Sequence, residues 1–494
     1  MDTAELQRRA RRGVLALVGR TALVQLAVLG GSIALARLLD PADFGVFAIV
    51  QFALAFIAYF GDAGLGAALI QKKEPPTQGE LASVFWLQLL LGLAVVLLVG
   101  LGAGAVQLVW PGLPPAAVWL LRALSLGLLL TLPRVIPCIL MERELQFGRL
   151  GALDVAGQVA FYLAAVPLAA LGAGVWSLAL GVLGQAVVVT ALAFALRPWR
   201  PTLALDRRGL RAMVRFGLPF QAKNLVGFVN GALTPLYGGV ALGERRLGYI
   251  NWAQATAYFP LKLVEIMARV TFPLLSRLQH DHALLSRELG RSIRICAIAT
   301  LGYAALIAAL GEPIVRLVYT DKWLPALPLL YLYAGAISLG FLAPIVASAL
   351  DALGRPGLFL RLSVAWTALA WLAVLFATPR WGMVGFVAGY CLHVVVGNIA
   401  VIFVVRRLVP QARLWPSVRA AIAGALAAGL LGRLVLAPHV AGLGLLGLGV
   451  AAMAVVFAAV VLLLDPALAR ELRGWAQSHR RLRYAARGDK MRFR

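Results

Sequence analysis

The feature that most constrains this chain is a succession of apolar runs, each about 20 residues long, separated by short segments rich in Arg and Lys. A bilayer core about 30 Å thick needs about 20 apolar residues per spanning helix. Such runs predict helices, because hydrocarbon offers the backbone no hydrogen-bond partner and barrel strands are shorter. We expect about fourteen spans, or twelve without the break at LGAG (171–174), near residues 14–36, 44–70, 81–108, 116–141, 150–171, 174–196, 214–240, 249–275, 292–318, 326–350, 357–377, 382–405, 418–437 and 441–464.

Composition agrees with an all-α integral membrane protein. The 494 residues are 61% hydrophobic and 14% charged, whereas a soluble domain is roughly 45–50% apolar. The net charge of +25 would suggest nucleic acid in a soluble protein, but here the basic residues lie in short connections. We therefore expect no nucleic-acid partner. The three cysteines, Cys138, Cys296 and Cys391, fall far apart inside apolar runs and predict no metal, cofactor or disulfide framework.

The distribution of basic residues predicts the topology. Most of the 46 Lys and Arg lie in alternate connections and in the two terminal segments, whereas the opposite connections hold only Arg37, Arg245, Arg246, Lys322 and Arg380. By the positive-inside rule, both termini are cytoplasmic and the number of spans is even. The N-terminal segment has no small-residue cleavage site before Leu38, which predicts a retained first span rather than a signal peptide. The opposite loops are too short for a catalytic domain.

The longest internal connection divides the chain. We expect a six-helix lobe over 1–196, a cytoplasmic linker over 197–217 that is either an interfacial helix or a solvated segment, and a second six-helix lobe over 214–405. Two additional helices over 406–464 and a basic tail over 465–494 follow, the tail lying against anionic lipid headgroups.

An internal repeat at an offset of 203 residues supports two related lobes. It aligns spans one and two with spans seven and eight, pairing Arg12 with Arg215, Arg20 with Lys223, Gly45 with Gly248, Gln51 with Gln254, Phe56 with Phe259 and Asp62 with Glu265. Six spans separate the copies, so both have the same orientation. The repeat is therefore parallel, with a pseudo-twofold axis along the membrane normal.

Several charged residues lie inside the spans. Arg122, Arg316 and Arg433 are near helix ends and can extend to the interface. Each basic residue at the bilayer centre would cost about 2.5–3.5 kcal/mol facing lipid, so the remaining five should face a protein interior or a wet cavity: Arg20, Lys223, Lys262, Arg269 and Arg134, the last between two prolines that should kink its helix. The acidic candidates for charge pairing or ion coupling are Asp62, Glu265 and Asp154.

Two interpretations of these charges remain open. They could form ion pairs that stabilise the bundle, such as Arg20 with Asp62 and Lys223 with Glu265. Alternatively, they could line a cationic cavity open to the cytoplasm, which the surplus of bases favours. Lys262, Glu265 and Arg269 follow i, i+3, i+7 spacing and share one helical face. Aromatic residues such as Tyr59 and Tyr258 could stack on sugars or form an interfacial belt, and His393 is better explained as a hydrogen-bonded interior residue than as a proton carrier.

The stretch ALARLLDPADFGVFAIVQFALAFIAYFGDAGLGAALIQKKE (34–74) resembles the start of bacterial O-antigen and exopolysaccharide repeat-unit flippases. These belong to the multidrug/oligosaccharidyl-lipid/polysaccharide exporter superfamily, and the sequence most resembles its colanic-acid-exporter branch. The ALGRP segment (352–356) also resembles that family. The resemblance implies a V-shaped pair of lobes around a cavity, and an undecaprenyl-diphosphate-linked oligosaccharide flipped to the periplasmic leaflet. By position, Arg20, Lys262 and Arg269 match the family's cavity-lining bases, and Lys223 joins them through the repeat.

The leading hypothesis is thus a flippase of the bacterial inner membrane that works by alternating access, its lobes rocking about the 197–217 linker. Expected partners are the lipid-linked oligosaccharide, membrane lipids and polysaccharide polymerase machinery. An ion-coupled multidrug exporter is the first alternative, although a net basic interior suits cationic drugs poorly. A membrane-embedded polymerase or ligase is the second, although the sequence has no nucleophile motif, P-loop or large periplasmic loop. We expect a transporter rather than an enzyme.

Overall fold

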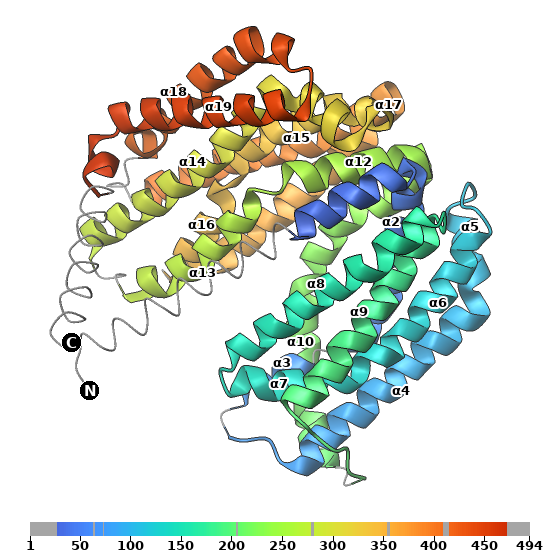
Figure 1. The fold of residues 1–494 in the computed structure, drawn as a ribbon. Coiled ribbons are helices and arrows are strands. Elements are labelled where there is room, and N and C mark those ends of the chain that lie inside the picture. The colour runs from blue at the N-terminus through green and yellow to red at the C-terminus, as the bar shows by residue number, and fades with distance from the viewer. Residues whose placement is uncertain are drawn as a thin grey trace, which may run out of the picture. The chain divides into compact units, whose positions relative to one another are not determined.

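The computed structural model of the protein describes residues 27–62, 65–72, 74–203, 206–277, 281–352, 356–408 and 414–471, which form helices joined by short turns, with no strand among them (Figure 1). The all-α prediction is confirmed. By its contacts the chain divides into two compact units, Met1–Trp252 and Ala253–Arg494. Their boundary falls inside one helix, whereas the lobes expected from the repeat meet near residues 197–217. That lobe division stays a prediction.

In the first unit, α8 and α9 pack along each other, α9 also packs on α6, and α6 packs on α2 and α4 (Figure 1). Small residues allow this close approach: a Cβ at Gly157 of α8 would lie 2.8 Å from Val189, and one at Gly181 of α9 would lie 2.9 Å from Ala165. The helices are α2 Pro41–Asp62, α3 Leu65–Gln71, α4 Gln78–Gly102, α5 Val106–Val109, α6 Ala116–Thr131, α7 Val135–Arg143, α8 Phe147–Ala170, α9 Val175–Leu196, α10 Arg207–Ala232, α11 Gly239–Leu242 and α12 Glu244–Ala257.

In the second unit, α14 packs on α13, α15 and α18, and α18 packs on α19. Arg294 of α14 also ties down the end of the described chain, since its guanidinium lies 3.3 Å from Asp465 and 3.0 Å from Glu471. The helices are α13 Leu261–Arg277, α14 His282–Ile314, α15 Leu327–Gly340, α16 Leu342–Ala352, α17 Pro356–Leu408, α18 Leu414–Leu431 and α19 Leu443–Leu464.

Eleven of the described helices are long and apolar enough to cross a membrane. One of them, over 357–407, consists of two helices joined at Gly382, whose φ of 57° and ψ of −137° interrupt the helix. The shorter helix Ala27–Leu38 and the pair α12 and α13 occupy the positions of two further expected spans. The chain is therefore a multi-pass membrane protein, and the total of fourteen spans stays a prediction.

The LGAG break, on which the expected number of spans depends, is confirmed. Helix α8 ends at Ala170 and α9 begins at Val175. Between them Gly172 has a φ of 83° and Gly174 a φ of 53°. Glycine adopts this region without a steric penalty, because it has no Cβ.

Prolines interrupt the expected spans at two further places. The predicted kink around Arg134 is confirmed: a 3-10 segment, Leu132–Arg134, joins α6 to α7, because Pro133 has no backbone donor. Span eight, expected to be continuous, divides at Pro260 into α12 and α13.

The 197–217 segment contains no separate interfacial helix. Residues 198–203 are not helical, and α10 begins at Arg207 and continues without interruption to Ala232. The second half of the expected linker is thus the first three turns of α10, and the apolar part of this helix that is able to span a membrane begins at Leu225. Because α10 is continuous, the chain leaves the connection along the axis of this helix.

Candidate functional site

The basic residues predicted to bind substrate that the structure describes lie on three elements. Arg134 is half-buried at the kink between α6 and α7, in the first unit. Lys223 is a residue of α10, in the same unit. In the second unit Lys262 is exposed in the first turn of α13, and Arg269 belongs to the same helix. Arg20 lies outside the described residues.

The acidic candidates lie on three elements. Asp62 belongs to α2. Glu265 is exposed on α13, three residues after Lys262, and Asp154 is exposed on α8. Arg134 and Asp154 both interact electrostatically with the Cys138 thiol, which brings these two candidates into one neighbourhood of the first unit. The expected Arg20–Asp62 and Lys223–Glu265 pairs stay predictions.

Two repeat-related glycines form a close helix crossing in the first unit. A Cβ at Gly45 of α2 would lie 1.8 Å from the carbonyl oxygen of Glu244, and a Cβ at Gly248 of α12 would lie 1.7 Å from that of Pro41. Pro41 and Glu244 are related by the same offset of 203 residues as the two glycines. The two contacts are therefore copies of one another, as in an isologous contact across a twofold axis. This reciprocity supports the parallel repeat.

An ion pair lies beside the crossing. Arg245 Nη2 is 3.0 Å from Asp40 Oδ1, and both side chains are largely exposed. By the topology expected from the sequence, this end of α2 and α12 is the periplasmic end. The contact between the helices is made by backbone against backbone, because only glycine leaves room for the opposing carbonyl. Backbone packing therefore contributes more to the stability of this helix contact than the exposed ion pair does.

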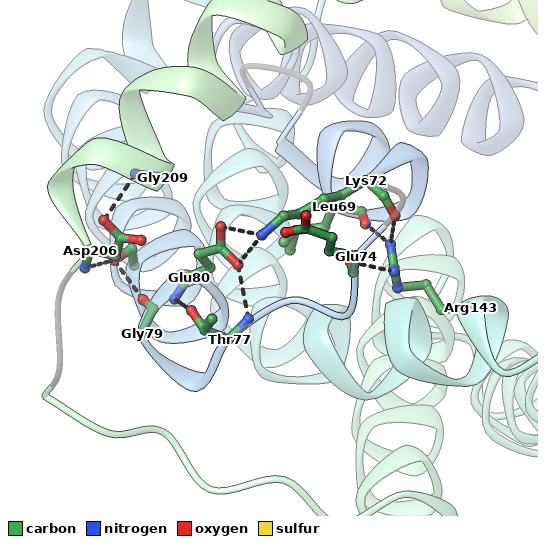
Figure 2. A network of polar contacts seen from close by, with 10 residues as sticks. Leu69, Lys72, Glu74, Thr77, Gly79, Glu80, Arg143, Asp206 and Gly209 are labelled. Carbon is green, nitrogen blue, oxygen red and sulfur yellow. Dashed lines mark hydrogen bonds and ion pairs between the residues drawn. The ribbon is translucent and has the colours of Figure 1, made fainter.

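A polar network joins the start of α4 to the connection after α3 (Figure 2). Lys72 Nζ donates to both carboxylate oxygens of Glu80, at 2.6 and 2.7 Å. Glu80 Oε2 also accepts from the Thr77 amide at 2.9 Å, while Thr77 Oγ1 accepts from the Glu80 amide at 3.2 Å. This reciprocal capping box satisfies amide groups that an uncapped helix start would leave unpaired.

The segment before α10 is held against the same region. Thr202 O accepts from Trp86 Nε1 at 2.9 Å, Ser83 Oγ accepts from the Asp206 amide at 2.7 Å, and Trp199 Nε1 donates to Gln78 Oε1 at 3.1 Å. Asp206 in turn caps α10, since its Oδ1 accepts from the Gly209 amide at 2.9 Å (Figure 2). We call the three bonds to Trp86, Ser83 and Gln78 the linker clasp. They attach the linker to α4 of the first unit.

Arg143 caps the C-terminal end of α3. Its guanidinium donates to carbonyl oxygens of Leu69, Ile70, Lys72 and Glu74, with distances of 2.7 Å to Lys72 O and 2.9 Å to Glu74 O (Figure 2). The last carbonyl groups of a helix have no intrahelical partner, and a cation there also complements the helix dipole. The positive-inside pattern accounts for Arg143 only as one of the basic residues of a connection, and it does not predict this capping role.

A cavity of about 610 Å³ lies next to the linker clasp, bounded by residues 75–78, the end of α7 and residues 197–202. Arg143, Arg197, Trp199 and Arg200 contribute to its lining, and no residue predicted to bind substrate does. Arg143 is engaged with backbone oxygens, and Arg197 forms an ion pair of 2.7 Å with Glu144. Two of its three guanidinium groups thus already have partners, and we assign this cavity no ligand.

The interior interpretation of His393 is confirmed. The side chain is buried and its Nδ1 hydrogen-bonds the Tyr390 carbonyl oxygen. Tyr390 also contacts Tyr333 and Tyr258, with ring centroids 5.9 Å apart in the first pair and the hydroxyl oxygens 3.4 Å apart in the second. Tyr258 therefore belongs to an internal cluster of the second unit, whereas Tyr59 contacts the Phe228 ring of α10.

A multi-pass helical chain whose repeat-related helices cross at a pseudo-twofold contact belongs structurally with the transporters built from parallel repeats. Residues 34–328 match the family of polysaccharide biosynthesis proteins. The match covers more than half of the chain, so the protein belongs to that family.

Two curated relatives extend the comparison. The chain is 27% identical over 396 residues to the lipopolysaccharide biosynthesis protein WzxC of Escherichia coli (strain K12), covering 77% of this chain and 76% of WzxC. It is also 27% identical over 311 residues to the succinoglycan biosynthesis transport protein ExoT of Rhizobium meliloti (strain 1021), covering 63% and 62%.

Solved structures show the same fold. The lipid II flippase MurJ in an inward closed conformation superposes with a TM-score of 0.73 at 13% identity, covering 93% of this chain and 99% of MurJ. An inward-facing multidrug resistance transporter of the MATE family gives 0.64 at 18% identity, covering 79% and 95%. At these identities the likeness concerns the fold alone, and it confirms the superfamily architecture expected from the sequence.

Proposed function

We propose that this protein moves an undecaprenyl-diphosphate-linked oligosaccharide from the cytoplasmic to the periplasmic leaflet of a bacterial inner membrane, for surface polysaccharide biosynthesis. The observation that carries the proposal is membership of the polysaccharide biosynthesis family in a chain built of membrane-spanning helices. The relatives support it, since ExoT is a transport protein and MurJ, of the same fold, is a lipid II flippase. The protein acts as a transporter, not as an enzyme.

The diphosphate of the substrate is bound by Arg20, Lys223, Lys262 and Arg269, with Arg134 nearby in the first lobe. Charge-assisted hydrogen bonds from guanidinium and ammonium groups replace the hydration that the anion loses on leaving water. Asp62, Glu265 and Asp154 balance these bases when no substrate is bound. The sugars cross inside the protein while the prenyl chain stays in lipid. Both termini lie in the cytoplasm.

Translocation proceeds by alternating access. The crossing at Gly45 and Gly248 closes the periplasmic end in one state and separates in the other. The linker clasp supports a flexing point away from the 197–217 linker, because side chains of the first unit hold that segment. We place the flexing point at the break between α12 and α13, near Pro260. The exported lipid-linked unit then passes to polymerase machinery.

The charge assignment is tested in a deletion strain complemented with variants of this chain. Lys262→Gln combined with Arg269→Gln should lower surface polysaccharide at least about tenfold, because each lost charge-assisted bond is worth about 1.5–3 kcal/mol. Lys262→Arg should retain export. Arg380→Gln is the matched control, since Arg380 is exposed and stacks its guanidinium 3.8 Å from the Phe376 ring. Undiminished polysaccharide at normal protein levels in the double variant would overturn the assignment.

The alternative is a multidrug exporter, which the MATE-like fold favours as far as architecture goes. A binding surface of net positive charge would repel cationic drugs. Export of such drugs by the complemented strain, with unchanged polysaccharide, would decide for this alternative.

A further inference from the structure

The break between α12 and α13 leaves one backbone oxygen without its helical partner. In an uninterrupted α-helix the amide of residue 260 would donate to the carbonyl oxygen of Thr256. Pro260 has no amide proton, so this bond cannot form at any angle between the two helices. The amide of Phe259 reaches Thr256 O only at 3.4 Å. In a chain that crosses a membrane an unpaired carbonyl oxygen is costly, because lipid supplies no donor.

A tyrosine hydroxyl takes the place of the missing amide. Tyr303 of α14 donates to Thr256 O at 2.6 Å, which is the shorter of the two bonds that this oxygen accepts. The Tyr303 ring also lies beside the Phe259 ring, with the centroids 6.3 Å apart. A second hydroxyl contacts the same residue, since Tyr319, in the π-helical segment Val315–Tyr319 after α14, hydrogen-bonds the Thr256 side chain. Both the backbone and the side chain of Thr256 are therefore held by tyrosines.

The residue two positions further on is also anchored within the second unit. The hydroxyl oxygen of Tyr258 lies 3.4 Å from that of Tyr390 in α17. Its ring meets the Tyr333 ring of α15 edge to face, with the centroids 6.2 Å apart. The end of α12 is thus attached to α14, α15 and α17. Bending at the break is consequently concentrated after these anchored residues.

The other copy of the internal repeat has neither the break nor the tyrosine. At the offset of 203 residues Pro260 corresponds to Ile57, which has an amide proton, and α2 continues through it without interruption. At the same offset α14 is the counterpart of α4, since the two helices begin at residues 282 and 78. Tyr303 then corresponds to Gly100, which has no side chain. The proline and the hydroxyl therefore occur together in one copy and are both absent from the other.

We propose that Tyr303 is the positioning residue of the flexing point between α12 and α13. Its hydroxyl replaces the amide proton that Pro260 lacks and keeps Thr256 fixed while the chain bends after it. The proposal rests on the proposed function, in which the protein flexes at this break, and adds the side chain that holds the break. Because proline supplies no donor at any helix angle, Thr256 O needs an outside partner throughout the transport cycle. Without the hydroxyl the break opens more often and its angle is less well defined.

The test is a double-mutant cycle on the full-length protein in detergent micelles, measured by hydrogen–deuterium exchange of peptides covering residues 257–263. Tyr303→Phe removes the hydroxyl and keeps the ring. It should speed exchange about fivefold, which is the effect expected from the loss of one hydrogen bond. In Pro260→Ala, residue 260 has an amide that can pair with Thr256 O. Adding Tyr303→Phe to that variant should therefore change exchange less than about twofold.

Two variants of α8, in the first unit, serve as controls. Tyr162→Phe removes a tyrosine hydroxyl elsewhere and should leave exchange at residues 257–263 unchanged. In Pro167→Ala, which removes a different proline, Tyr303→Phe should still speed exchange about fivefold. Equal acceleration by Tyr303→Phe with proline and with alanine at position 260, or no acceleration with either, would overturn the proposal. Packing of the ring alone does not depend on an amide at residue 260.

Surface polysaccharide in the complemented deletion strain is the second measurement. Tyr303→Phe should lower it severalfold, and adding Tyr303→Phe to Pro260→Ala should cause no further loss. Undiminished polysaccharide in Tyr303→Phe would overturn the role in transport. Failure of the proposed function has a different signature, because polysaccharide would then not depend on this chain at all. The exchange cycle needs no substrate and would still show the coupling between Tyr303 and Pro260.

Discussion

At the scale of single residues, charged side chains differ in how much their contacts contribute to the stability of the protein. Arg143 donates to backbone oxygens at the end of α3 and is half-buried. Arg245 pairs with Asp40 in an exposed position, with 60% and 46% of the two side chains accessible. Solvent screens the second interaction, and such pairs contribute about 0–1 kcal/mol. Removing Arg143 instead leaves carbonyl groups unpaired, which costs more.

We therefore expect Arg143→Gln to destabilise the protein by about 1.5–3 kcal/mol, the range for hydrogen bonds to a charged group. Thermal unfolding in detergent measures the loss. Arg361→Gln is the matched control, because exposed Arg361 makes a single backbone bond of 3.4 Å to Gly357 O and should change the unfolding temperature little. Equal stability of the two variants would contradict the capping role.

At the scale of helical elements, the crossing of α2 and α12 depends on two positions that admit no side chain. A methyl group at Gly45 or Gly248 would overlap a carbonyl oxygen, so the helices would have to separate. Other glycines are not constrained in this way. A Cβ at Gly100 of α4 would meet no atom within 4 Å, so this position tolerates a methyl group. Whether a position requires glycine therefore depends on the atoms that an added Cβ would meet.

Gly45→Ala and Gly248→Ala should each destabilise the protein by about 1–3 kcal/mol through overpacking and should reduce polysaccharide export. Gly100→Ala should be neutral or slightly stabilising, because alanine favours the helix by roughly 0.5–1 kcal/mol. Arg245→Gln should change stability by less than about 1 kcal/mol. Unfolding temperature and surface polysaccharide are measured for all four variants. Normal export in both glycine variants would rule out the crossing as a gate.

At the scale of the whole molecule, movement requires a place where the chain can bend. The linker clasp holds residues 199–206 on the first unit, and the break at Pro260 separates α12 from α13. Pro260→Ala should allow the two helices to join and should lower export severalfold with little loss of stability. Pro167→Ala in α8 is the control, since Pro167 lies inside one continuous helix. Unchanged export in Pro260→Ala would exclude this flexing point.

Sequence patterns predicted the architecture well, since apolar run length, glycine breaks and prolines are local signals. The LGAG break and the kink at Arg134 are examples. The break at Pro260 was not expected, because the apolar run continues across it. The linker clasp was beyond prediction: Trp86 meets Thr202 across 116 residues of sequence, and no local pattern encodes that contact. The Thr77–Glu80 capping box, by contrast, has a local signature, Thr followed three residues later by Glu before an apolar run, and could have been predicted.

The reciprocal crossing also has an evolutionary consequence. In an ancestor made of two identical subunits, one glycine codon would have supplied both contacts, and every change there would have acted twice. After duplication and fusion each copy could vary independently. Because each glycine faces a backbone carbonyl, the opposing side chains were free to diverge, and today they are the dissimilar Pro41 and Glu244. The glycines had no such freedom, which accounts for glycine at both repeat-related positions, Gly45 and Gly248.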